Sequence, residues 1–366
     1  MAEEQDPKES QSNEETQKQR VRVYFNNIQS AAWEHPADKV GMRALKTVPG
    51  VDTVLRLFLD YIANEHGFKL LALAVAVRVN EKQFPRLYKL HLEACKVLNM
   101  ETIPELFVTQ NPMYNAGAMG IKDPCILINS SMINDLTDDE LLFVIGHELG
   151  HIKSEHMLYR TLFFFLDLMM KNSHRLPFPK IALGTLMGVF YALLEWSRKS
   201  ELSCDRAGLL VVQDPEVAVQ LVMKLAGGKK LEEMDLGEFM RQAEEYNEKG
   251  TVNDNLMKIL HLVSQTHPFP VIRVYELMQW IRSGEYENII RGYYSNEEDT
   301  TLGEDAEKAA NSYKKGFRQT FKPIEDMMND IKDNVQKGAM SGKNPWEIFD
   351  DLMKKGRKKE AEEKED

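Results

Sequence analysis

Three residues in the run FVIGHELGHIKSEH, residues 143–156, could bind a metal ion and act on a bound water. His147, Glu148 and His151 form the pattern H-E-x-x-H inside an apolar stretch that predicts a helix. Because side chains four residues apart lie on one face of a helix, both imidazoles can point at one ion, with Glu148 beside them. A catalytic zinc site takes three protein ligands and leaves one position for water. The rest of the chain must therefore supply a third ligand.

The elements that would position these residues can also be predicted. Thr137 followed by Glu140 forms a capping box, which sets the start of the helix and places both histidines well inside it. Between residues 105 and 129, short apolar runs alternate with Gly, Pro and Asn and predict a small antiparallel sheet. Residues 70–79, LLALAVAVRV, are interpreted as a further strand. The fold class predicted is α+β and mostly helical, with the sheet before the metal-binding helix.

A second long helix, predicted over about residues 181–212, carries the missing ligand. Glu201 and Asp205 lie four residues apart and so share a face of that helix. If the two helices pack antiparallel, Glu201 can complete the metal site and Asp205 can accept the outward N–H of a ligand histidine, as carboxylate partners do in metal sites. The alternative is an exposed, ion-paired face with Arg198. The apolar character of the helix and the incomplete H-E-x-x-H favour the metal site.

Composition restricts the classes of function. With 43% hydrophobic and 28% charged residues the chain is globular, and its net charge of -11 argues against nucleic-acid binding. The three cysteines are far apart in the sequence, which favours a reducing compartment, and the acidic N-terminus has no apolar signal segment, so we expect a cytoplasmic protein. The longest nearly uncharged stretch, residues 181–194, is too short to span a bilayer. A peripheral membrane contact through residues 161–194 stays open.

The distribution of charged and apolar residues divides the chain into four predicted parts. Residues 1–20 form an acidic tail without core residues, and residues 21–83 form a helical and strand segment that packs on the catalytic domain. Residues 84–290 hold the metal-binding pattern and form the metallopeptidase domain. Residues 291–366 are rich in Lys, Glu and Asp and are predicted as a charged helical region with a disordered tail.

Four motifs together resemble one known family. H-E-L-G-H at 147–151 and R-x-x-E-x-x-x-D at 198–205 are similar to motifs of the HtpX-like zinc metallopeptidases, the gluzincin group that also includes the CaaX prenyl proteases. Asn115-Ala116 resembles that family's edge-strand segment, and His267-Pro268 with Arg273 resembles its His-Pro motif. The resemblance covers roughly residues 84–282 and implies a zincin-type fold. Many members carry transmembrane helices that this chain lacks, so we expect a soluble or peripheral member.

The resemblance implies a role for each residue. One Zn²⁺ would be bound by His147, His151 and Glu201, with Asp205 behind them. Glu148 would be the general base that activates the water, and His267 would be a second donor to the oxyanion; a histidine bonded to backbone is the alternative for His267.

Two further residues are predicted to bind substrate. Asn115 could bond a peptide that adds to the edge strand. Arg273 either binds substrate or pairs with an acidic residue.

The function predicted from the sequence is a zinc-dependent metalloendopeptidase of the 3.4.24 type that acts on protein or peptide substrates, with a role in protein quality control. The alternative is a zinc-stabilised chaperone-like or peripheral membrane-binding protein without turnover. The sequence does not determine the physiological substrate, the cleavage specificity, the oligomeric state or the role of the charged C-terminal region.

Overall fold

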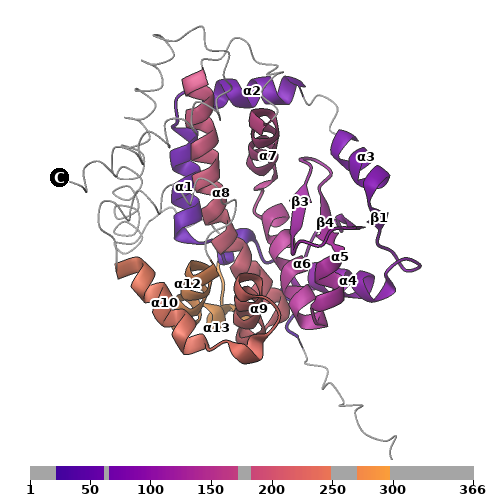
Figure 1. Ribbon diagram of the computed structural model, residues 1–366, viewed down its shortest axis with the longest axis vertical. Helices are drawn as coiled ribbons and strands as arrows, with labels where there is room; N and C mark the ends of the chain where they lie inside the picture. The colour runs from indigo at the N-terminus through magenta and orange to yellow at the C-terminus, as the bar shows by residue number, and fades with distance from the viewer. Residues whose placement is uncertain (1–21, 62–65, 172–182, 249–269, 297–366) are drawn as a thin grey trace, which may run out of the picture.

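The longest helix, α8 (Leu183–Val212), runs beside α6 (Asp138–Lys153), and the remaining elements surround this pair (Figure 1). The computed structural model describes residues 22–61, 66–171, 183–248 and 270–296. The predicted tail at 1–20, most of the C-terminal region and His267 lie outside the described residues.

Before α6, the elements in chain order are the 3-10 helix η1 (Ser30–Ala32), α1 (Pro36–Lys46), α2 (Val51–Tyr61), α3 (His66–Val75), β1 (Val77–Arg78), α4 (Pro85–Val97), β2 (Glu105–Thr109), β3 (Ala116–Met119), β4 (Cys125–Asn129) and α5 (Ser130–Asp135). After α6 come α7 (Met157–Lys171), α8, α9 (Pro215–Gly227), the 3-10 helix η3 (Leu231–Glu233), α10 (Leu236–Glu248), α12 (Pro270–Arg282) and α13 (Glu285–Ile290). The predicted α+β, mostly helical class is confirmed.

The sheet precedes α6, as predicted, but it is mixed. Its strand order is β1-β2-β4-β3. β1 pairs antiparallel with β2, and β3 pairs antiparallel with β4, whereas β2 and β4 run parallel, with Phe107 opposite Leu127. The prediction of a purely antiparallel sheet was wrong for this one pair, because β3 lies in the connection between β2 and β4 and takes the outer edge. β3 is therefore an edge strand.

The strand predicted for residues 70–79 was wrong over most of its length, since it forms α3 and only Val77–Arg78 pair as β1. Leu and Ala favour helix, and the run is apolar enough for either state. Ala72 packs against Phe107 of the sheet, so tertiary contact with the sheet selects the helix.

The start of α6 confirms the capping box. The Thr137 hydroxyl accepts the N–H of Glu140, and the Glu140 carboxylate accepts the N–H of Thr137 at 2.8 Å. The same carboxylate forms a buried ion pair of 2.6 Å with Lys224 of α9. The first turn of α6 is thus bound to a second helix.

Small residues bring α6 and α8 into close contact. A Cβ atom added to Gly146 would lie 2.6 Å from the Val211 side chain, and one added to Gly150 would lie 2.7 Å from Ala207. Contacts later in α6 are made to residues earlier in α8, so the two helices are antiparallel, as the interpretation of Glu201 required. Short backbone separation lets side chains of one helix reach the ligands on the other.

Two hydrophobic clusters lie along this helix pair. The larger joins α4, α6 and the C-terminal half of α8 to the sheet, and includes Phe143 and Leu210. The second joins α1, α2 and α7 to the N-terminal half of α8, and includes Phe58 and Trp196. Among the described residues, no helix is both long enough and apolar enough to cross a membrane.

Candidate metal centre and active site

Three predicted ligands converge between α6 and α8. His147 Nε2 lies 3.2 Å from Glu201 Oε2, and His151 Nε2 lies 3.2 Å from Glu201 Oε1. All three residues are at least 94% buried, and their ligand atoms lie within 4.8 Å of one another. Tetrahedral zinc with bonds of about 2.1 Å places neighbouring donors about 3.4 Å apart. The spacing and the donor types, two imidazoles and one carboxylate, therefore fit zinc.

Asp205 orients the first ligand. Its Oδ1 accepts the Nδ1–H of His147 at 3.0 Å, which directs Nε2 of that ring toward Glu201. Burial alone would lower the pKa of His147, but hydrogen bonds and charge from Asp205 and Glu201 raise it to about 9. The imidazole is therefore cationic at neutral pH in the metal-free chain, and a metal ion must displace the Nε2 proton.

Arg273 lies behind Asp205. Its Nε and Nη2 donate to the two oxygens of Asp205 at 2.8 and 2.5 Å. Burial would raise the pKa of Asp205, but the facing guanidinium holds it below the usual value, so this carboxylate stays ionised. Of the two roles left open for Arg273, this geometry favours pairing with an acidic residue, although the side chain also lines the cleft.

Arg160 of α7 was missed by the sequence reasoning. Its Nη1 lies 2.7 Å from Glu201 Oε1 and 2.6 Å from His151 Nε2. Burial, and next the nearby guanidinium, hold the pKa of His151 well below its usual value, so His151 is neutral. No motif marks Arg160, because it follows the end of α6 and reaches the ligands only through the turn between α6 and α7.

His156 lies five residues after His151, so a continued α6 would point it away from the His151 ring. α6 ends at Lys153 instead, and Glu155 adopts a left-handed conformation with φ of 56°. The turn brings His156 Nδ1 to 3.2 Å from His151 Nδ1. Cys204 Sγ lies 3.9 Å from His156 Nδ1, and burial raises the pKa of this thiol well above its usual value. Cys204 is therefore a protonated, buried thiol.

The Glu148 side chain points toward the edge strand β3. Its Oε2 accepts the backbone N–H of Ala118 at 2.8 Å. The Ala118 N–H therefore points away from β4, toward the free edge of the sheet. The backbone N–H and C=O groups of successive residues in a strand point to alternate sides, so those of Ala116, two residues earlier, point to the same free edge. The side chain that would act as base thus lies between the metal ligands and the edge strand.

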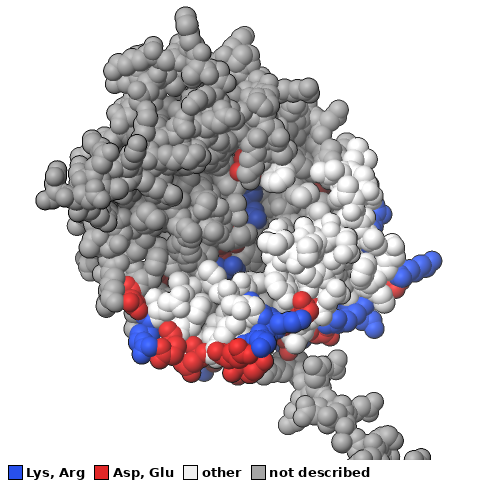
Figure 2. Space-filling view, viewed as in Figure 1, with Lys and Arg blue, Asp and Glu red and all other residues white. Residues whose placement is uncertain are grey.

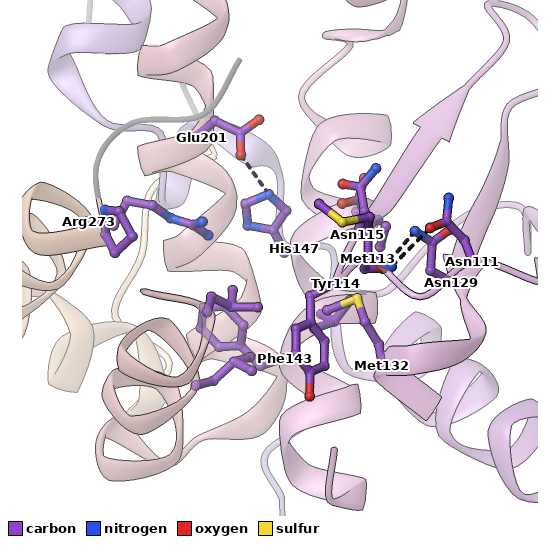
Figure 3. Close-up of a pocket in the computed structure, with 16 residues that line it drawn as sticks. Asn111, Met113, Tyr114, Asn115, Asn129, Met132, Phe143, His147, Glu201 and Arg273 are labelled. Carbon is purple, nitrogen blue, oxygen red and sulfur yellow. Dashed lines mark hydrogen bonds and ion pairs between the residues drawn. The ribbon is translucent and has the colours of Figure 1, made fainter. Parts of the chain in front are cut away.

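A cleft of about 610 Å³ opens over these residues. Figure 3 shows His147 and Arg273 on one side and Asn115, Met113 and Tyr114 on the other. Glu148 and Glu201 also line it. Asn115 lines the cleft as well, and its backbone carbonyl accepts the N–H of Asn129, which holds the start of β3 against β4. The predicted donor His267 lies outside the described residues, three positions before Pro270, which also lines the cleft.

Comparison with known proteins defines the class. Residues 81–281 match Peptidase family M48, which is more than half of the chain. The chain belongs to this family, the HtpX-like zinc metallopeptidases, and is a metallopeptidase. The family implies a metal cofactor, and the ligand geometry described above fits zinc.

Individual relatives support the assignment. The chain is 34% identical over 275 residues, 74% of its own length and 78% of the relative's, to the plastoglobule-localized metallopeptidase 48, chloroplastic, of Arabidopsis thaliana. It is 24% identical over 236 residues to an HtpX protease homolog of Ralstonia pickettii, covering 58% of this chain and 79% of that one. An HtpX homolog of Burkholderia cenocepacia is 24% identical over 240 residues, 58% and 80% of the two chains. No solved structure matches the chain.

Proposed function

We propose that this metallopeptidase is a zinc-dependent endopeptidase in which His147, His151 and Glu201 hold the ion and Glu148 is the general base. The convergence of the three ligand atoms beside the Glu148 carboxylate, on the wall of one cleft, carries the proposal. A zinc ion bound there supplies Lewis-acid activation of the attacking water and of the scissile carbonyl. Asp205 and Arg273 support the site by holding the His147 ring in place.

Within this proposal Glu148 moves the proton. Its carboxylate takes a proton from the attacking water and returns it to the departing amine. The hydrogen bond from the Ala118 N–H holds one carboxylate oxygen and leaves the other for water. His267 is proposed as a second donor to the oxyanion, on the family resemblance alone.

The edge strand β3 supports an extended peptide as substrate. The Ala116 backbone groups that face away from β4 can pair with a peptide laid along the cleft, while the Ala118 N–H stays bonded to Glu148. Main-chain pairing of this kind selects an extended peptide with little dependence on side chains. Asn115, at the start of β3, is proposed to bond the same peptide backbone. A broad endopeptidase with a role in protein quality control is the function that this geometry supports best.

Metal analysis combined with casein cleavage tests the proposal. We expect about one zinc per chain, cleavage of casein at internal bonds, loss of cleavage after 1,10-phenanthroline and dialysis, and recovery on addition of zinc. Peptide products read by mass spectrometry distinguish internal cleavage from trimming at the ends. Zinc binding without turnover would contradict the proposal and favour the zinc-stabilised chaperone-like alternative.

A peripheral membrane contact in the cytosol is our second proposal, and we assign it to α3 rather than to residues 161–194. In the described part of residues 161–194 the large apolar side chains are mostly buried, with Phe164 as the exposed exception at 50%. On α3, by contrast, Leu70, Leu71, Leu73 and Val75 are between 44% and 62% exposed. Figure 2 shows an uncharged surface over α3. Such a helix can place apolar side chains in a lipid surface.

The double variant Leu71→Glu/Val75→Glu tests this contact. We expect the wild type to co-sediment with liposomes and the variant to partition at least about tenfold more weakly, because each lost apolar side chain removes roughly 1.5–3 kcal/mol of burial. Tyr293→Glu, a change at a 74% exposed residue after α13, is the control and should sediment like the wild type. Equal sedimentation of the double variant and the wild type would exclude α3 as the contact.

A further inference from the structure

A chain of buried hydrogen bonds runs from the ligand His151 to a residue far away in the sequence. His151 Nδ1 lies 3.2 Å from His156 Nδ1, and His156 Nε2 lies 3.1 Å from Asp38 Oδ2. All three residues are at most 2% exposed. Asp38 belongs to α1, outside the residues that match the peptidase family.

The direction of each hydrogen bond in this chain follows from its Asp38 end. Asp38, as a carboxylate, can only accept, so His156 donates the proton on its Nε2. The neutral His156 ring then presents a lone pair at Nδ1, and the His151 Nδ1 that faces it donates its proton. The other nitrogen of the neutral His151 ring, Nε2, is left with a lone pair on the side of Glu201. Each ring therefore has one tautomer compatible with a carboxylate at position 38.

Two hydrogen bonds from α8 fix the position of the Asp38 carboxylate. Its Oδ1 accepts the Trp196 indole N–H at 2.9 Å, and its Oδ2 accepts the Ser203 hydroxyl at 2.7 Å. Both partners lie on α8, the helix that also carries Glu201, so α1, α8 and the turn after α6 are tied together at one buried carboxylate. Burial would raise the pKa of Asp38, but His156 and these donors lower it, so it stays ionised.

We propose that Asp38 and His156 are positioning residues that hold the His151 ring in the orientation and tautomer in which Nε2 faces the metal. The inference rests on the proposed zinc site and deepens it. It gives the N-terminal segment a role in the metal centre that parallels the role of Asp205 at His147. The two ligand imidazoles are then each oriented by a carboxylate, one directly and one through a second histidine.

Asp38→Asn tests the proposal with little change in shape. The Trp196 N–H cannot reverse, so the amide oxygen stays against it and the amide N–H₂ faces His156. His156 must then accept at Nε2 and donate from Nδ1, which forces the proton of His151 onto the metal-facing Nε2. We expect zinc affinity, measured by competition with a chromophoric chelator, to fall about 10–100-fold. In a ¹⁵N-histidine spectrum of the metal-free protein, the His156 proton should move from Nε2 to Nδ1.

Three further variants separate positioning from packing. His156→Ala should lower zinc affinity by a similar factor, and adding Asp38→Asn to it should cause no further loss, because Asp38 acts through His156. Leu45→Ala removes a buried α1 side chain from the hydrophobic cluster that also contains Trp196, a partner of Asp38. This variant should lower the melting temperature but leave zinc affinity unchanged.

The outcomes distinguish this inference from the proposed function. A wild type that binds no zinc would overturn both. A wild type that binds zinc, with Asp38→Asn binding equally well, would overturn the positioning role alone. The positioning role would also be overturned if the losses of zinc affinity caused by Asp38→Asn and His156→Ala multiplied in the double variant. It would be overturned as well if Leu45→Ala weakened zinc binding as much as Asp38→Asn does.

Discussion

Glu148→Gln should abolish peptide hydrolysis while zinc stays bound. The amide cannot accept the proton of the attacking water, and loss of a general base costs about 10²–10⁴-fold in rate. The site should otherwise persist, because Glu148 is not one of the three converging ligands and the glutamine oxygen can still accept the Ala118 N–H. The measurement is kcat for casein or a quenched fluorescent peptide, together with zinc content per chain.

Glu155→Gln provides the control for the same chemical change. Glu155 is exposed in the turn after α6, so both its zinc content and its kcat should equal those of the wild type. Wild-type cleavage by Glu148→Gln would remove Glu148 from the mechanism. Loss of zinc from Glu148→Gln would show instead that this side chain helps to hold the metal.

Glu201→Gln should remove the metal together with activity. Glu201 places one oxygen against each ligand imidazole, and one of these oxygens also pairs with Arg160. A neutral amide loses the negative charge that these three contacts use and turns an N–H₂ group toward one of the imidazoles. We expect zinc affinity to fall by more than the roughly 100-fold that loss of an outer-sphere partner can cost. Chelator competition and metal analysis after dialysis measure this loss, and kcat should fall in proportion to the zinc lost.

The matched control is Glu195→Gln, on the same helix. Glu195 is also largely buried among cations, pairing with Lys199 at 3.1 Å and with Arg198, but it does not approach the ligand histidines. Its zinc affinity should be that of the wild type, even if the protein is less stable. Unchanged zinc affinity in Glu201→Gln would be incompatible with Glu201 as the third ligand.

Local rules explain which parts of the fold were predictable. The capping box at Thr137 and the H-E-x-x-H spacing depend on contacts within four residues, and backbone geometry alone places these groups. Glu201 and Asp205 were found because they too share a helical face, and one assumption, antiparallel packing of two helices, was enough to join them to the histidines. The mixed sheet and α3 were predicted less well, because strand order and the choice between helix and strand for an apolar run depend on distant partners.

By itself, the sequence determined the donor types, their spacing and the two helices that carry them, and these define the chemistry. Only the tertiary structure decided what surrounds the donors: Arg160 and His156 reach His151 because the chain turns at Glu155, and Asp38 reaches His156 from α1, more than a hundred residues earlier. A ligand's partners depend on a helix end and on the packing of α1 against α8, which no local periodicity encodes. The H-E-x-x-H run therefore identifies the reaction centre, while the buried polar network that orients it is a property of the assembled fold.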